Sequence, residues 1–273
     1  MTDLANIHAV ANAFVGARLK NEVVNNYPGT LPATLADAYA IQDEAIQIVG
    51  KVVGGWKVGR VAPHLVQAAQ ANRIAGPIFA DSIFQEDGES PVSMPVLQGF
   101  AAAEAEIMLR IGAIPVQANL SNIRDYIDQV RFGIEIASSP FPDINEHGPA
   151  VTASDFGNNF GLVLGPQILD WKQRNLMAAP VALELGGKVV GTGQLSGMLD
   201  GPFGAAAFLV NLLTSRGIAV TPGMWISTGA ITGVHKIEYG QSVRATFDNE
   251  FEVSCRTTLY SPPIVSSEGN NVG

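Results

Sequence analysis

Four stretches of the chain carry apolar residues at the three- to four-residue spacing of one helix face. Thr34 begins the second stretch with a side chain suited to capping, and Gly50 ends it. The last stretch follows Asp200, has Pro202 in its first turn and reaches Gly217, which is typical of helix boundaries. The pattern therefore predicts helices over residues 4–20, 34–50, 122–130 and 202–217.

Elsewhere the pattern changes to short apolar runs interrupted by Gly and Pro, as in the strands of a buried sheet. These runs cover residues 52–59, 103–110, 132–137, 160–165, 179–190, 223–228, 243–247 and 251–259. Strands dominate after residue 100, so we expect an α+β protein with helices attached to a thick sheet core. We divide the chain into a helical N-terminal cap (1–50), one catalytic unit (51–265) and a frayed tail (266–273).

Composition and charge exclude several classes of protein. The chain has 273 residues, of which 47% are hydrophobic and 15% charged, so it is not a disordered protein. The net charge of -9, without a basic cluster, argues against nucleic acid as a partner. Cys255 is the single cysteine, which favours a reducing compartment. The first residues lack a basic segment, and Pro222 interrupts the longest uncharged run, 217–234, so we expect a cytoplasmic protein without a membrane span.

Two carboxylates interrupt the apolar run "AAAEAEIML" at residues 101–109. In a strand, Glu104 and Glu106 would face the same side, about 6–7 Å apart at Cα. Glu135 has a similar setting in "RFGIEIAS". Three carboxylates on two strands would make an oxygen site suited to Mg²⁺ or Mn²⁺. Alternatively, Glu104 and Glu106 lie on a solvated edge strand and Glu135 pairs with an arginine.

Lys57 lies in the apolar, glycine-bracketed segment "GGWKVGR". In a pocket such a lysine is a candidate for proton transfer or for stabilising an enolate, whereas at a strand end it would simply pair with an acid. In the turn-rich segment "STGAITG", Ser227 and Thr228 offer hydroxyl and amide groups that could hold a carboxylate, or they form an ordinary turn.

The order of several short motifs provides further information. "GWKVG", "AAEAEIML", "GIEIASSPF", "SDFGNNFGLVLG", "GTGQLSGMLDGPFG" and "PGMWISTGA" follow one another along the chain. This series resembles the fumarylacetoacetate hydrolase superfamily, within it the branch of 2-hydroxypentadienoate hydratases and 4-oxalocrotonate decarboxylases. The resemblance implies a mixed β-sheet roll with peripheral helices that forms homo-oligomers. It also implies a Mg²⁺ or Mn²⁺ site at Glu104, Glu106 and Glu135, with Lys57 as the catalytic lysine.

The activity implied first is a lyase of aromatic catabolism that adds water to 2-hydroxy-2,4-dienoates. Decarboxylation of 4-oxalocrotonate-type 2-oxo-3-enedioates is the alternative, because Ile74 stands where hydratases often carry an acidic residue and Asp81 lies further along. C–C bond hydrolysis of acylpyruvates, or a non-catalytic subunit that binds 2-oxo acids, ranks third. Association with a related decarboxylase or hydratase is plausible for this branch. Thr228 or Ser227 would grip the substrate carboxylate, and Asn159 and Asp155 would form pocket walls.

Overall fold

A computed structural model describes residues 3–86, 90–115 and 118–262. Its α-helices are α1 (Leu4–Lys20), α2 (Leu35–Val49), α3 (Val66–Ala69), α4 (Pro149–Ser154) and α5 (Gly201–Ser215). Its strands are β1 (Val53–Arg60), β2 (Arg73–Phe79), β3 (Ile83–Gln85), β4 (Val92–Val96), β5 (Phe100–Ile111), β6 (Ile127–Ser139), β7 (Asn159–Gln167), β8 (Pro180–Leu185), β9 (Lys188–Gln194), β10 (Trp225–Ser227), β11 (His235–Lys236), β12 (Ser242–Phe247) and β13 (Phe251–Leu259).

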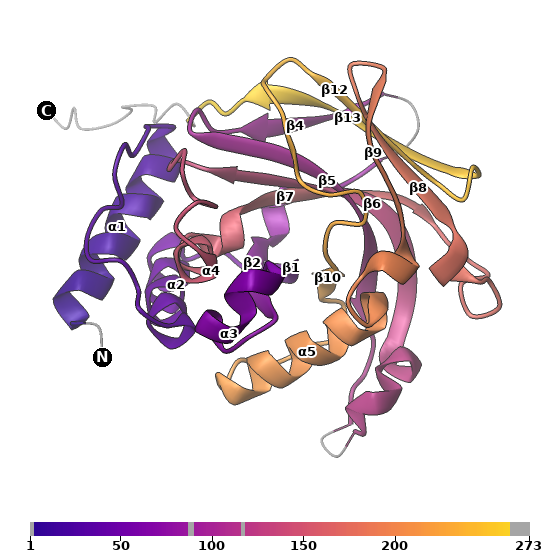
Figure 1. Cartoon of the computed structure of the whole chain (residues 1–273), viewed down its shortest axis with the longest axis horizontal. Helices are drawn as coiled ribbons and strands as arrows, with labels where there is room; N and C mark the ends of the chain where they lie inside the picture. Colours follow the sequence, from indigo (N-terminus) through magenta and orange to yellow (C-terminus); the bar gives the residue numbers. More distant parts are fainter. Residues whose placement is uncertain (1–2, 87–89, 116–117, 263–273) are drawn as a thin grey trace, which may run out of the picture.

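The strands form two curled sheets with mixed strand directions (Figure 1). The larger, eight-stranded sheet has the order β2-β1-β10-β5-β6-β7-β3, with β11 also paired to β5. The smaller, five-stranded sheet has the order β4-β13-β12-β8-β9 and lies at the top of Figure 1. The α+β class and the mixed β-roll expected from the sequence are confirmed.

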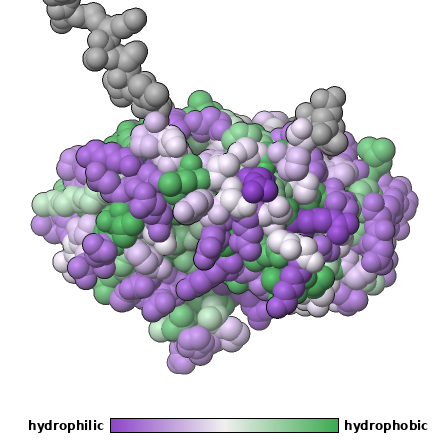
Figure 2. Space-filling view, turned by 90° about the horizontal axis from the view of Figure 1, so that it is seen from above, coloured by the Kyte–Doolittle hydropathy of each residue, from purple (hydrophilic) through white to green (hydrophobic). Residues whose placement is uncertain are grey.

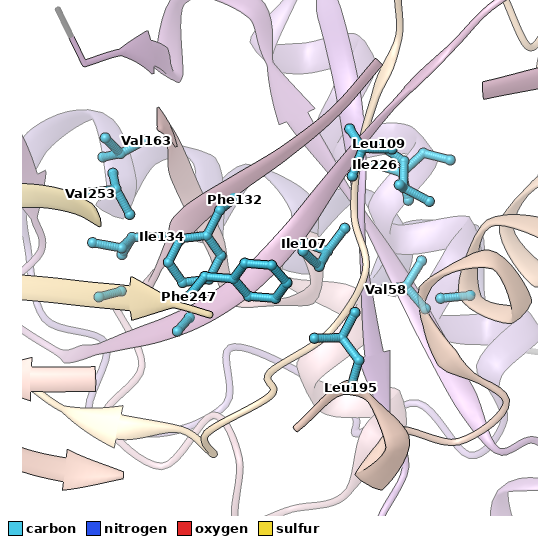
Figure 3. Packing of buried hydrophobic residues seen from close by; sticks show 14 of the residues in the cluster. Val58, Ile107, Leu109, Phe132, Ile134, Val163, Leu195, Ile226, Phe247 and Val253 are labelled. Carbon is cyan, nitrogen blue, oxygen red and sulfur yellow. The ribbon is translucent and has the colours of Figure 1, made fainter. Parts of the chain in front are cut away.

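The main core lies between the two sheets. Phe132 and Ile134 of β6 meet Phe247 of β12 and Val253 of β13, and the rings of Phe132 and Phe247 lie 5.1 Å apart (Figure 3). Burial alternates along β12, as expected when one face of a sheet covers a core. Seen from above, the outer surface carries hydrophilic residues with scattered hydrophobic ones (Figure 2).

The N-terminal helices form a second, smaller core. Phe14 of α1 and Ile41 of α2 pack with Phe100 and Phe141, next to the end of β5. A capping box between Thr34 and Asp37 begins α2 as the sequence predicts. The division of the chain at residue 50 stays a prediction, and the expected tail (266–273) lies outside the described residues. Among the residues described, no helix has both the length and the apolar character needed to cross a membrane.

The helix expected over 122–130 is wrong. A 3₁₀ turn covers Leu120–Tyr126, and β6 begins at Ile127. Ile127 and Val130 do follow a helical spacing, but both pair with β5 in the sheet, and this non-local pairing overrides the local pattern. The strand-like run 179–190 covers two strands: β8 and β9 form a hairpin whose turn places Gly186 and Gly187 at positive φ.

Candidate metal centre and adjoining pocket

Strand register brings the three predicted carboxylates together. Glu104 of β5 lies directly opposite Glu135 of β6, and Glu106 shares their face two residues further along β5. One oxygen from each of the three side chains lies within 4.8 Å of the others, and all three residues are buried. β5 lies between β10 and β6, so the alternative of a solvated edge strand is wrong.

Neighbouring groups fix the orientation of two of these carboxylates. The hydroxyl of Ser227 donates to Oε2 of Glu106 at 2.5 Å, and the amide of Gly229 donates to the same oxygen at 2.8 Å. The side-chain amide of Asn159 donates to Oε1 of Glu135 at 3.0 Å. Oε1 of Glu106 is buried and has no hydrogen-bond partner among the described residues. That oxygen is therefore available to a further ligand.

Lys57 provides the positive charge beside this cluster. Its Nζ lies 3.1 Å from Oε1 of Glu135 and 3.4 Å from Oδ1 of Asn158, and its side chain is 6% exposed. Burial lowers the pKa of Lys57, but the three carboxylates outweigh this effect and hold the pKa above its usual range. Lys57 is therefore a charged ammonium rather than a neutral amine, and its positive charge offsets part of the negative charge of the cluster.

Two of the carboxylates, Glu104 and Glu106, are harder to ionise than usual when no cation is bound. Burial raises the pKa of Glu104 to about 7 and raises that of Glu106 well above its usual range, where the charges of Glu135 and Glu104 add to the effect. Three hard oxygen donors, one of them unpartnered, suit an ion of the Mg²⁺ or Ca²⁺ kind. A divalent metal therefore fits the residues present, and these chemical properties do not select among such ions.

A pocket of about 390 Å³ opens beside the cluster. Its charged and polar lining residues are Lys57, Arg60, Glu104, Asn145, Thr152 and Asn158, and Ile74 and Leu65 are among the apolar ones. Glu104 is the only acidic residue among the described residues that line it. The geometry thus places the three-carboxylate cluster, an ammonium group and apolar side chains around one small space.

The four residues expected to bind substrate lie around this space but do not line it. Ser227 and Asn159 hold the carboxylates, and the Thr228 hydroxyl donates to the backbone oxygen of Ile107 at 2.8 Å. Asp155 is buried in an ion pair with Arg18. Their role in substrate binding stays a prediction. Asp81 pairs with Lys51 at 2.8 Å, on exposed side chains.

The sequence did not indicate Asn158, Gly229 or Arg18. Asn158 has a positive φ, which the turn-forming segment "DFGNN" permits but does not by itself predict. Gly229 acts through its backbone amide, so its residue type does not reveal its role. Arg18 lies 137 residues before its partner Asp155, so no local pattern connects the two.

Sequence comparison gives relatives over nearly the whole chain. A 4-oxalocrotonate decarboxylase of Pseudomonas putida is 25% identical over 257 residues, covering 93% of this chain and 96% of the relative. A 2-oxo-hept-4-ene-1,7-dioate hydratase of Escherichia coli is 22% identical over 232 residues, covering 82% and 86%. No family model matches the chain.

Two solved structures share the fold. The 4-oxalocrotonate decarboxylase of Pseudomonas putida G7, complexed with magnesium and adipate, superposes with a TM-score of 0.78 at 22% identity, covering 94% of this chain and 99% of that one. The fumarylpyruvate hydrolase of Pseudomonas aeruginosa gives 0.58 at 17% identity, covering 75% and 89%. The resemblance to the fumarylacetoacetate hydrolase superfamily is confirmed. The relatives of its decarboxylase and hydratase branch are enzymes, which supports enzymatic activity for this chain.

Proposed function

We propose that this chain is a divalent-metal-dependent lyase that decarboxylates 2-oxo-3-enedioates of the 4-oxalocrotonate type. The observation that carries the proposal is the convergence of three buried carboxylates beside the charged Lys57 and an apolar-walled pocket. The decarboxylase relative and the structural neighbour of that name support it.

Glu104, Glu106 and Glu135 would hold the metal, which we propose to be Mg²⁺ or Mn²⁺. One structural neighbour is complexed with magnesium and another with Mn²⁺. When bound, such an ion supplies a Lewis acid that stabilises negative charge developing on the 2-oxo oxygen of a substrate. Ser227, Gly229 and Asn159 would keep the carboxylate ligands oriented, because each donates a hydrogen bond to one of them.

Two residues of the pocket would promote the cleavage of the C–C bond that releases CO₂. In a 2-oxohex-3-enedioate the C5–C6 bond breaks, its electron pair moves through the conjugated chain to O2, and CO₂ leaves. Lys57 supplies the proton that O2 takes up, and its charge opposes the growing negative charge there. Ile74 lines the pocket with an apolar surface, which favours conversion of a charged carboxylate into neutral CO₂.

Hydration of 2-hydroxy-2,4-dienoates, the activity that the resemblance implied first, is the second candidate. The hydratase relative supports it, and the same electron sink would serve it. Ile74 argues for placing it second, because this apolar side chain lies in the pocket wall where a hydratase would need a group to activate water. C–C bond hydrolysis and non-catalytic binding of a 2-oxo acid remain third.

The test is an assay of the purified chain with Mg²⁺ or Mn²⁺ on 2-oxohex-3-enedioate, with CO₂ and organic products measured by mass. We expect CO₂ and 2-hydroxypentadienoate in equal amounts, and no turnover after removal of metal by a chelator. Water addition to 2-hydroxypentadienoate without CO₂ release would establish the second candidate instead. Metal-dependent binding without turnover of either compound would identify a binding subunit.

The remaining expectations concern partners and location. We propose a small 2-oxo acid as the substrate, self-association of the chain, and a related hydratase as a further partner. Sedimentation of the purified chain, alone and mixed with such a hydratase, tests both kinds of association. A cytoplasmic location stays a proposal that fractionation of cells would test.

A further inference from the structure

The segment that links α4 to β7 has an unusual backbone. Phe156, Gly157 and Asn158 follow one another with φ values of 55°, 60° and 57°. Glycine and asparagine tolerate this left-handed region, but a bulky side chain such as that of Phe156 disfavours it, so other contacts must hold the segment in this conformation. The left-handed segment, which we define as residues 155–159, therefore needs an external restraint.

Arg18 of α1 supplies that restraint. Its guanidinium donates to both carboxylate oxygens of Asp155, at 2.6 and 2.9 Å, and to the backbone oxygen of Asp155 at 3.2 Å. It also donates to the backbone oxygen of Asn159 at 3.1 Å, and to that of Ser138, on β6, at 3.0 Å. One buried side chain thus holds both ends of the left-handed segment and ties them to β6, the strand that carries Glu135.

The left-handed segment in turn contacts the metal centre twice. Asn159 donates to Oε1 of Glu135 at 3.0 Å, and Asn158 accepts from Lys57 at 3.4 Å. The backbone conformation between these two residues decides where both side chains point. In the described part of the chain Arg18 makes no hydrogen bond or ion pair with the three carboxylates, so any influence on the metal centre passes through the segment.

We propose that Arg18 is a positioning residue of the metal centre, holding residues 155–159 in the conformation that directs Asn159 to Glu135 and Asn158 to Lys57. The proposal rests on the metal-binding part of the proposed function. It gives the N-terminal helix α1 a role in the site, although α1 contributes no metal ligand. Removing a group that orients a metal ligand commonly weakens metal binding by about 10- to 100-fold.

The first experiment compares Arg18→Lys with Lys20→Met, a control at an exposed position of the same helix. Calorimetry measures Mg²⁺ and Mn²⁺ affinity, and circular dichroism checks folding. Because lysine cannot make the forked contacts to Asp155, we expect about tenfold weaker metal binding for Arg18→Lys and no change for Lys20→Met. A folded Arg18→Lys variant with affinity within roughly twofold of the parent would overturn the proposal.

A second experiment separates positioning from general loosening of the fold. Asn159→Ala removes the donor to Glu135, so Arg18→Lys should add little further loss of metal affinity in that background. Losses that multiply fully in the double variant would mean that Arg18 does not act through Asn159.

If Arg18→Lys does not fold, hydrogen exchange of the parent protein takes its place. Linkage is reciprocal, so metal binding should slow amide exchange in residues 155–159 and at the end of α1 more than in the β8–β9 hairpin. Uniform slowing would contradict the proposal. A parent protein that binds neither ion would instead remove the metal-binding function, and the positioning role with it.

Discussion

Glu104 and Glu135 lie directly opposite each other on the antiparallel strands β5 and β6, and both are buried. Like charges in this arrangement repel, and burial removes the solvent that would screen them. Three ionised carboxylates and the Lys57 ammonium carry -3 + 1 = -2 charges, which one divalent cation balances. Without the cation, protons on the carboxylates must reduce the negative charge instead. The first two predictions test the binding of the cation and of these protons.

Glu106→Gln should abolish metal binding while leaving the fold intact. Glutamine keeps an acceptor for Ser227 and Gly229 but removes one negative charge and one ligand oxygen. Since loss of an outer-shell partner alone weakens binding 10- to 100-fold, we expect a loss of roughly 100-fold or more, with a matching loss of turnover. Calorimetry and the CO₂ assay measure the two effects.

The matched control for this variant is Glu22→Gln. It makes the same substitution at an exposed glutamate that is distant in sequence from the cluster. It should bind metal and turn over substrate as the parent does. Metal affinity of Glu106→Gln equal to that of the control would remove Glu106 from the set of ligands.

Stability of the metal-free protein should fall as pH rises from about 4.5 to 7. The pKa of Glu104 is raised from 4.5 to about 7 in the folded state, mainly by burial. Over this interval the folded protein therefore binds more protons than the unfolded chain, and the free energy of unfolding decreases with pH. Saturating Mg²⁺ should reverse the trend, because the cation favours the ionised carboxylates.

Urea unfolding at several pH values, with chelator and with Mg²⁺, measures this dependence. Glu104→Gln is the matched variant, because it removes one of the two carboxylates with a raised pKa and should make the fall of the metal-free curve between pH 4.5 and 7 less steep, with Glu106 still contributing. A metal-free parent that gains stability over the same interval would contradict the assignment of raised pKa values to the cluster.

The sequence predicted that Glu104 and Glu106 point to the same side because strand parity is a local property. Glu104 and Glu106 share a face whatever their neighbours, and an isolated Glu135 in an apolar strand already required a partner. The register that sets Glu104 against Glu135 is non-local, so periodicity could not give it, and only the family resemblance implied that the three residues meet. The same non-local pairing explains the wrong helix at 122–130, where β5 recruits Val130 into a strand.

The supporting residues were beyond reach of the sequence for a related reason. Asn158 and Gly229 act through backbone conformation or a backbone amide, and Arg18 acts through a partner distant in sequence. For Ser227 and Asn159 the sequence predicted the location near the site but not the group that each side chain contacts. Contacts depend on side-chain direction, and here both side chains donate to carboxylates of the cluster.

Lys57→Met should lower kcat far more than it weakens metal binding. Methionine fills a similar volume but provides neither a proton nor a charge. Loss of a proton donor commonly lowers rates by about 10²- to 10⁴-fold, whereas removing a cation from beside the ligands should leave metal affinity equal or higher. Steady-state kinetics and calorimetry measure both. Lys51→Met, at a half-exposed ion pair, is the control, and a kcat for Lys57→Met equal to the control's would exclude Lys57 from the chemistry.

Gly76→Ala should destabilise the protein and displace the segment beside Lys57. Gly76 pairs with Lys57 across β1 and β2, and an added Cβ would overlap the backbone carbonyl of Phe156. Backbone cannot move as a flexible side chain does, so we expect a loss of about 1–3 kcal/mol in the free energy of unfolding. Gly16→Ala, in open space on α1, should instead stabilise by about 0.5–1 kcal/mol. Equal stability of the two variants in urea unfolding would show that the close approach at Gly76 is not required.

Ile74→Asp tests whether the apolar wall selects decarboxylation. Ile74 is 6% exposed and lines the pocket that contains Lys57 and Glu104. An added carboxylate there would repel a dianionic substrate and remove the apolar surface that favours neutral CO₂. We expect kcat/KM for CO₂ release to fall by at least about tenfold, equivalent to about 1.4 kcal/mol, while Ile74→Leu stays near the parent value.

The same variant should gain water addition to 2-hydroxypentadienoate, because an aspartate in the pocket can accept a proton from water. Mass detection of 4-hydroxy-2-oxopentanoate measures this gain against Ile74→Leu. Undiminished CO₂ release by a folded Ile74→Asp variant would mean that the wall does not choose between the two reactions. The choice would then depend on how the far carboxylate of the substrate is placed relative to Lys57.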